Sequence, residues 1–143
     1  METIVVGVDG SEGASAAIEF AANEAALRGA RLRIVGSWEI PPAVLASVGL
    51  SRDFYEEFKD HAVTLVREAV VRVTELQPSV AHEERVIQGQ AGNVLVEEAQ
   101  DAALLVVGSR GHGGFRGLLL GSVSRQVVQH ARCPVVVVPP KEE

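Results

Sequence analysis

The stretch AALLVVGSRGHGGFRGLLLGS, residues 102–122, joins an uninterrupted apolar run to a loop that contains six glycines and two arginines. The apolar run, bounded by glycine, is typical of a strand that is covered on both faces, as in parallel sheets. Residues 122–130 then carry apolar side chains at helical spacing, and the segment PVVVVPP that follows predicts a strand from Pro134 to Val138. A strand, loop, helix and strand in this order favour a parallel α/β sheet.

The rest of the chain repeats this alternation of strands and helices. TIVVGVDG predicts a first strand that ends at Asp9 and Gly10, and Ser11 and Gly29 are residue types that begin and end helices. The remaining spacings predict a strand over 32–38, a loop or lid up to 51, a long amphipathic helix over 54–76, a weak strand over 84–87 and a short helix over 93–101. We therefore expect a doubly wound sheet of five parallel strands with helices on both faces.

Length, cysteine content and charge restrict the class of protein. The chain has 143 residues, 47% of them apolar, which suits a single domain over residues 1–143. Its one cysteine, Cys133, has no partner for an internal disulfide, and no leader or membrane span is recognised, so we expect a cytoplasmic protein. The net charge of −6 argues against nucleic-acid and membrane partners. Residues 108–132, however, carry four arginines and no acidic side chain, which favours an anion there.

In doubly wound sheets ligands bind beyond the carboxyl ends of the strands, so the loops after the first and fourth strands are the candidate site. The glycines of the second loop allow close approach of the backbone, and a helix begins near Gly121 and Ser122. Backbone amides, hydroxyls and the nearby Arg110 and Arg116 together suit a phosphate. The lysine of a Walker loop is absent, and the first turn has glycines three residues apart instead of a dinucleotide fingerprint. A solvated surface loop is the alternative interpretation.

The pattern Gly108-x-x-Gly111, nine residues, then Gly121-Ser122 resembles the signature of the universal stress protein family, in its ATP-binding branch. The stretches VVGVDGSEGASAAIEFA, GQAGNVLVEEA and CPVVVV extend the resemblance over nearly the whole chain. The resemblance implies one domain with a Rossmann-like sheet in the strand order 3-2-1-4-5. It also implies a homodimer that forms through the strand from Pro134 to Val138.

The resemblance further implies a bound nucleotide, ATP with ADP or AMP as alternatives, accompanied by Mg²⁺. Asp9 would then contact the adenosine, Ser37 would offer main-chain groups to adenine, and Gly108 would lie beside the ribose. The phosphate side of the implied site comprises Arg110, Gly111, His112, Gly113, Gly114, Gly121, Ser122, Val123 and Ser124. Carboxylates accept hydrogen bonds from hydroxyls, and glycines admit phosphate oxygens to the backbone, so the residue types agree with these roles.

Several residues also have simpler interpretations. Asp9 is a common turn residue, and His112 is equally explained as a solvated loop side chain. His61, His82 and His130 lack the spacing of metal ligands, and Cys133 is explained as an inert core thiol.

The functional hypothesis is a nucleotide-dependent stress-response regulator or sensor. No nucleophile paired with a base is recognised, so we assign no catalytic residue and no metal ligand, and expect at most weak ATP hydrolysis. The alternatives are a slow ATPase or nucleotidyl-transfer enzyme, and a dimeric scaffold without nucleotide.

Overall fold

The structure is a computed structural model, and it describes residues 1–48, 52–109 and 120–141. Strands and helices alternate along the chain. The strands are β1 Thr3–Gly7, β2 Arg31–Trp38, β3 His82–Gln88, β4 Leu104–Gly108 and β5 Val135–Val138, and the helices are α1 Glu12–Arg28, α2 Pro42–Val48, α3 Arg52–Leu76, α4 Ala91–Glu98 and α5 Ser122–His130.

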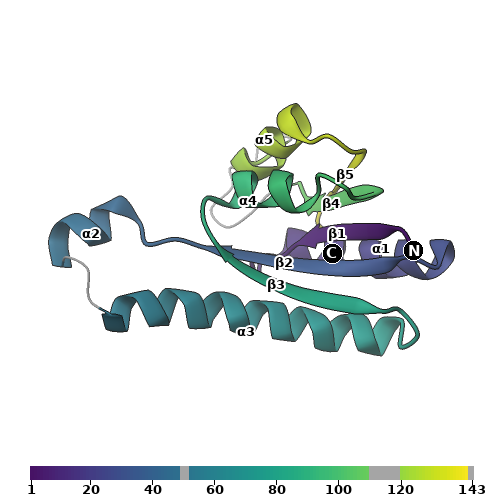
Figure 1. The fold of residues 1–143 in the computed structure, drawn as a ribbon, viewed down its shortest axis with the longest axis horizontal. Helices are drawn as coiled ribbons and strands as arrows, with labels where there is room; N and C mark the ends of the chain where they lie inside the picture. The colour runs from purple at the N-terminus through teal and green to yellow at the C-terminus, as the bar shows by residue number, and fades with distance from the viewer. Residues whose placement is uncertain (49–51, 110–119, 142–143) are drawn as a thin grey trace.

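The strands form one parallel sheet in the order β3-β2-β1-β4-β5, which confirms the predicted doubly wound fold (Figure 1). Helices α1 and α3 pack on one face of the sheet, and α4 and α5 pack on the other. The connections that follow the neighbouring strands β1 and β4 therefore leave toward opposite faces. A crevice is expected at such a point, beyond the carboxyl ends of the strands.

The central strand β1 is apolar at its three inner positions because both of its faces are covered. Ile4 and Val6 point to the core beneath α1 and α3, Val5 points to the core beneath α4 and α5, and all three side chains are fully buried. Each such burial contributes about 1.5–3 kcal/mol. Because a strand alternates its side chains between two faces, a strand covered on both needs apolar residues throughout.

Helix α1 has the ends that the sequence predicts. The Oγ of Ser11 accepts a hydrogen bond from the Ala14 N–H at 3.1 Å, so Ser11 is the N-cap. At the other end Gly29 has φ 63°, a left-handed conformation that favours glycine. The helix is thus fixed at both ends by local sequence.

Several predicted boundaries were wrong. Strand β1 ends at Gly7 and not at Asp9 and Gly10, and α4 ends at Glu98 and not at residue 101. The segment predicted as a loop or lid up to residue 51 contains α2, because Pro42 stands at the first helical position, where the fixed φ of proline suits a helix. Helix α4 begins at Ala91 and not at residue 93, because Gln90 is its N-cap and accepts the Asn93 N–H at 2.9 Å. Glutamine is not among the preferred N-cap residues, so the sequence pattern did not indicate this start.

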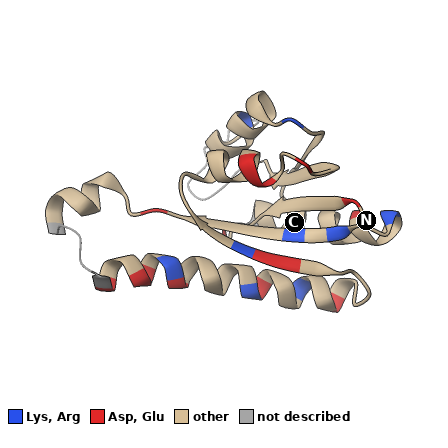
Figure 2. Cartoon of the chain, viewed as in Figure 1, with Lys and Arg blue, Asp and Glu red and all other residues tan. Residues whose placement is uncertain are grey.

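The two edge strands of the sheet differ in chemistry. Edge strand β3 carries charged side chains, which Figure 2 shows beside those of β2 and α4. The Nε of Arg33 on β2 lies 2.6 Å from Glu83 on β3, and Arg85 lies 2.8 Å from Glu98. The opposite edge, β5, consists of four partly exposed valines. Charges oppose pairing with another chain at β3, whereas β5 itself carries no charged side chain.

In the described ranges, none of the helices combines the length and the apolar character needed to cross a membrane.

Candidate functional site

A crevice with a cavity volume of about 280 Å³ opens at the carboxyl ends of β1, β2 and β4. Its lining comes from these strand ends, from the first turns of α1 and α5, from one side of α3 and from α4. The lining residues are Gly7, Val8, Asp9, Ser11, Ala14, Ser37, Trp38, Glu39, Phe58, His61, Ala62, Leu65, Ala91, Leu95, Val107, Gly108, Val123 and Ser124.

The crevice brings together residues that lie far apart in the sequence. Of the predicted site residues, the structure places Asp9, Ser37, Gly108, Val123 and Ser124 in its lining. Gly121 and Ser122 lie at the adjoining start of α5. The predicted residues Arg110, Gly111, His112, Gly113 and Gly114 lie outside the described residues.

Asp9 is held in a fixed turn after β1. Its Oδ1 accepts hydrogen bonds from the Ser11 N–H at 2.9 Å and from the Ser11 hydroxyl at 2.6 Å. Gly10, with φ 81°, allows the chain to turn between them. The turn interpretation of Asp9 is therefore correct, and within the described part of the chain only Oδ1 is engaged. Oδ2 can accept further hydrogen bonds.

Ser37 presents main-chain groups toward the crevice. The Val8 N–H donates to the Val35 carbonyl at 3.0 Å, and this is the last bond of the ladder between β1 and β2. In a strand the N–H and C=O of residues two apart face the same side, so those of Ser37 also face β1. Among the described residues the Ser37 N–H has no backbone partner on that side. One donor and one acceptor are thus open at the end of β2.

Gly108 is required for the close approach of β4 to α1. A Cβ built on Gly108 would lie 2.6 Å from the carbonyl carbon of Gly13, 2.8 Å from its oxygen and 3.0 Å from the Ala14 nitrogen. These are backbone atoms, and real Cβ atoms essentially never approach so closely. A packing role therefore explains the first glycine of the motif, independently of any ligand.

The Ser109 carbonyl joins the end of β4 to the start of α5. It accepts the Gly121 N–H at 2.6 Å and the Ser124 hydroxyl at 2.9 Å. The Ser124 hydroxyl also lies 3.1 Å from the Gly121 carbonyl, and this side chain is only 2% exposed. Gly121 and Ser124 thus hold the loop ends together, and the Gly121 N–H and the Ser124 hydroxyl are already engaged within the protein.

The first turn of α5 offers other donors. Its N-cap is Gly121, which has no capping side chain, and the first helical hydrogen bond runs from the Arg125 N–H to the Gly121 carbonyl. In the described part of the chain the N–H groups of Ser122, Val123 and Ser124 have no backbone acceptor, as expected at a helix start. These amides and the helix dipole favour an anion at this end of the crevice.

The wall that α3 contributes was missed in the sequence. Phe58, His61 and Leu65 line the crevice, although the helical spacing indicated only a core-facing helix and His61 was given no role. The signal was present in this spacing, because Phe58, Ala62 and Leu65 lie on one side of a helix. The spacing does not indicate that α3 extends past the end of β2.

Acidic, histidine and cysteine side chains do not gather into a metal centre in the part of the chain that the structure describes: no group of three could hold an ion. The crevice is therefore bounded by strand ends, helix amides, two exposed carboxylates and an apolar wall.

The fold and this crevice define a doubly wound α/β protein with a crevice at its switch point, the place where such folds bind small molecules. The model of the universal stress protein family matches residues 1–139, and the chain belongs to this family. A universal stress protein of Mycolicibacterium smegmatis is 39% identical over 142 residues, which cover 96% of this chain and 46% of that protein. The chain spans about half the length of the curated relatives that it matches.

Solved structures of similar proteins include nucleotide complexes. A universal stress protein in complex with cAMP is 30% identical, with a TM-score of 0.71 and coverage of 98% of both chains. The universal stress protein from Archaeoglobus fulgidus in complex with dAMP is 29% identical, with a TM-score of 0.72, and the match covers 96% of this chain and 98% of that one.

Proposed function

We propose that this protein binds an adenine nucleotide, ATP in the first place, and acts as a regulator or sensor whose state depends on that nucleotide. The observation that carries the proposal is the crevice at the switch point. Helix amides without a backbone acceptor among the described residues lie at one end, and an apolar wall lies at the other. The similar proteins solved with cAMP and dAMP support the adenine nucleotide. ADP and AMP remain alternatives within the same proposal.

Each part of the nucleotide has a counterpart in the described residues. The phosphates would meet the amides of Ser122, Val123 and Ser124, to which the exposed Ser122 hydroxyl adds a donor. The ribose hydroxyls would donate to Oδ2 of Asp9. The N–H and C=O of Ser37 would pair with the acceptor N1 and the donor N6 of adenine.

Mg²⁺ is proposed only as a companion of the phosphates. This ion is usually held by one or two carboxylates together with phosphates and water, and Asp9 and Glu39 are carboxylates of the lining. When bound, it would supply positive charge to the phosphate oxygens. The described residues form no separate protein site for it.

The binding proposal is tested by calorimetric titration of nucleotide-free protein with ATP, ADP, AMP and cAMP, with GTP as the matched control. We expect adenine nucleotides to bind at least tenfold more tightly than GTP. Guanine has a donor at N1 and an acceptor at O6, the reverse of adenine, so the N–H and the C=O of Ser37 would both be left without a partner. Absence of binding by every adenine nucleotide at millimolar concentration would contradict the proposal and favour a scaffold. Release of phosphate at many turnovers per protein molecule would favour the ATPase alternative.

We also propose a homodimer that forms through the open edge of β5. The carbonyls of Pro134 and Val138 accept hydrogen bonds from β4, so Val135 and Val137 direct their main-chain groups outward. We expect twice the chain mass in light scattering, and a monomer for Val137→Pro, which removes one outward N–H. Val136→Pro is the contrasting variant, because it removes an N–H that faces β4 and destabilises the monomer. A concentration-independent monomer mass for the unsubstituted protein would refute the dimer.

A single domain and a cytoplasmic location are also part of the proposal. Both cores lie on one sheet, which supports a single domain over residues 1–143. A cytoplasmic location fits a role that depends on a cellular nucleotide.

A further inference from the structure

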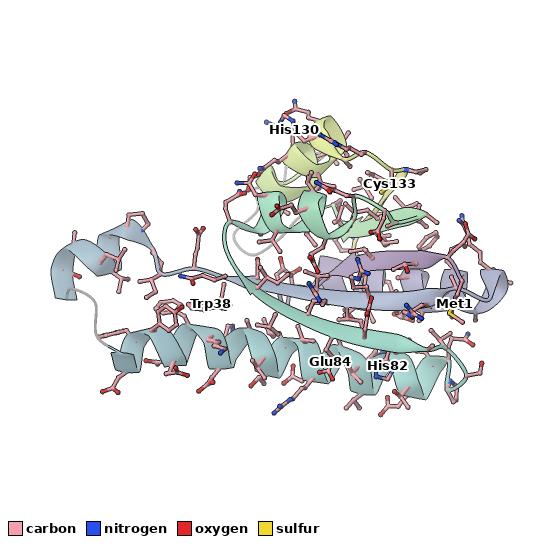
Figure 3. The ribbon with its side chains drawn as sticks, in the orientation of Figure 1. Met1, Trp38, His82, Glu84, His130 and Cys133 are labelled. Carbon is pink, nitrogen blue, oxygen red and sulfur yellow. The ribbon has the colours of Figure 1, made fainter. Side chains whose placement is uncertain are left out.

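The wall at the β2 end of the crevice is aromatic. Trp38, the last residue of β2, lines the crevice and is only 8% exposed, and Figure 3 shows it above α3. Phe58 and His61 continue the lining along α3, three residues apart and therefore on one side of the helix. Three flat rings from two elements thus border the end of the crevice opposite to α5.

Tyr55 holds the indole of Trp38 in place. Its ring meets the indole edge-on, with 4.6 Å between ring centroids and an interplanar angle of 87°. The Tyr55 hydroxyl donates to Oε1 of Gln88 at 2.9 Å, and Gln88 is paired with Trp38 in the register of β2 and β3. Tyr55, Trp38 and Gln88 thus fix one another, from α3, β2 and β3.

Tyr55 itself is not part of the crevice lining, so it reaches a ligand only through Trp38. We propose that Tyr55 is a positioning residue that fixes Trp38 as the wall against which the heteroaromatic base of a nucleoside phosphate stacks. The proposal rests on the proposed nucleotide binding and deepens it, because it states which part of the ligand the wall selects. Stacking of a base on an aromatic side chain contributes about 5- to 150-fold to affinity.

The test compares AMP with ribose 5-phosphate, which has the same sugar and phosphate but no base. We expect the unsubstituted protein to bind AMP at least about fivefold more tightly than ribose 5-phosphate, and we use this ratio of the two affinities as the readout. Tyr55→Ala is expected to reduce this ratio to below about twofold and to leave the affinity for ribose 5-phosphate unchanged. Glu56→Gln, at an exposed position beside Tyr55 on the same helix, is the matched control and keeps the ratio.

Fluorescence gives a second measurement, because Trp38 is the only tryptophan of the chain. Binding of AMP is expected to change the emission of Trp38, and binding of ribose 5-phosphate is not. The Tyr55→Ala substitution is expected to shift the emission of the ligand-free protein to longer wavelength. Tyr55→Phe keeps the ring and is expected to retain most of the ratio. If Tyr55→Ala does not fold, Gln88→Ala replaces it, with a smaller loss of the ratio and a smaller shift.

The outcomes separate this inference from the proposed function. A folded Tyr55→Ala variant with an unchanged ratio and emission overturns the inference, and so does an unchanged Gln88→Ala variant. Equal affinities of the unsubstituted protein for AMP and ribose 5-phosphate also overturn it, while the phosphate end of the crevice would stand. Failure of both ligands to bind would instead refute the proposed function.

Discussion

Gly121→Asp is expected to lower the affinity for ATP by two orders of magnitude or more and to leave the protein folded. Gly121 is the N-cap of α5 with φ −77° and ψ 175°, an extended conformation that any residue adopts. Aspartate is among the best N-cap residues, and its carboxylate would accept the free N–H groups of Val123 or Ser124. The donors proposed for the phosphates would then be occupied, and a negative charge would face the nucleotide.

Stability and affinity should therefore change in opposite directions. We expect the free energy of unfolding to rise by about 0.3–1 kcal/mol, measured by urea denaturation, while calorimetry shows the loss of ATP binding. Gly121→Asn is the matched control, because it caps the helix equally well without the charge. It should retain more of the affinity than the aspartate variant. A folded Gly121→Asp protein that binds ATP as tightly as its parent would remove α5 from the proposed site.

The fold could be predicted because its signals are local. Residues 4–6 and 104–107 are apolar and buried throughout, which is typical of a strand covered on both faces. Ser11 and Gly29 mark the two ends of α1 by chemistry that acts within one helical turn. The sequence pattern did not predict the start of α4, because Gln90 is an atypical N-cap residue. It also did not predict α2, because a proline is compatible both with a loop and with the first position of a helix, as at Pro42.

The candidate site could be predicted only in part, because its residues meet through tertiary contacts. The order of elements places Asp9 and Gly108 at adjoining strand ends, and the structure agrees. The sequence cannot reveal that the Gly121 N–H is taken by Ser109, since that bond depends on how the loop ends meet. Nor does it place Tyr55 against Trp38, which requires the length of α3 relative to β2.

Gly108→Ala is expected to destabilise the protein and to weaken nucleotide binding together. The added methyl would lie 2.6 Å from the Gly13 carbonyl carbon, so α1 must move away from β4. Overpacking of this kind costs about 1–3 kcal/mol. The displaced end of α1 begins at the turn formed by Asp9 and Ser11, which lines the crevice, so the contacts proposed for the ribose would shift with it.

Gly36→Ala provides the matched control for this prediction. Its methyl would lie 2.7 Å from Cγ2 of Val66, a side-chain atom, so the added Val66→Ala change removes the clash. We expect the double variant to be less destabilised than the two single variants combined, measured by urea denaturation. No such rescue exists for Gly108→Ala, because the atoms that it meets belong to the backbone of Gly13 and Ala14. A Gly108→Ala protein as stable as its parent would show that α1 can yield at this contact, and the glycine would then be explained by the ligand alone.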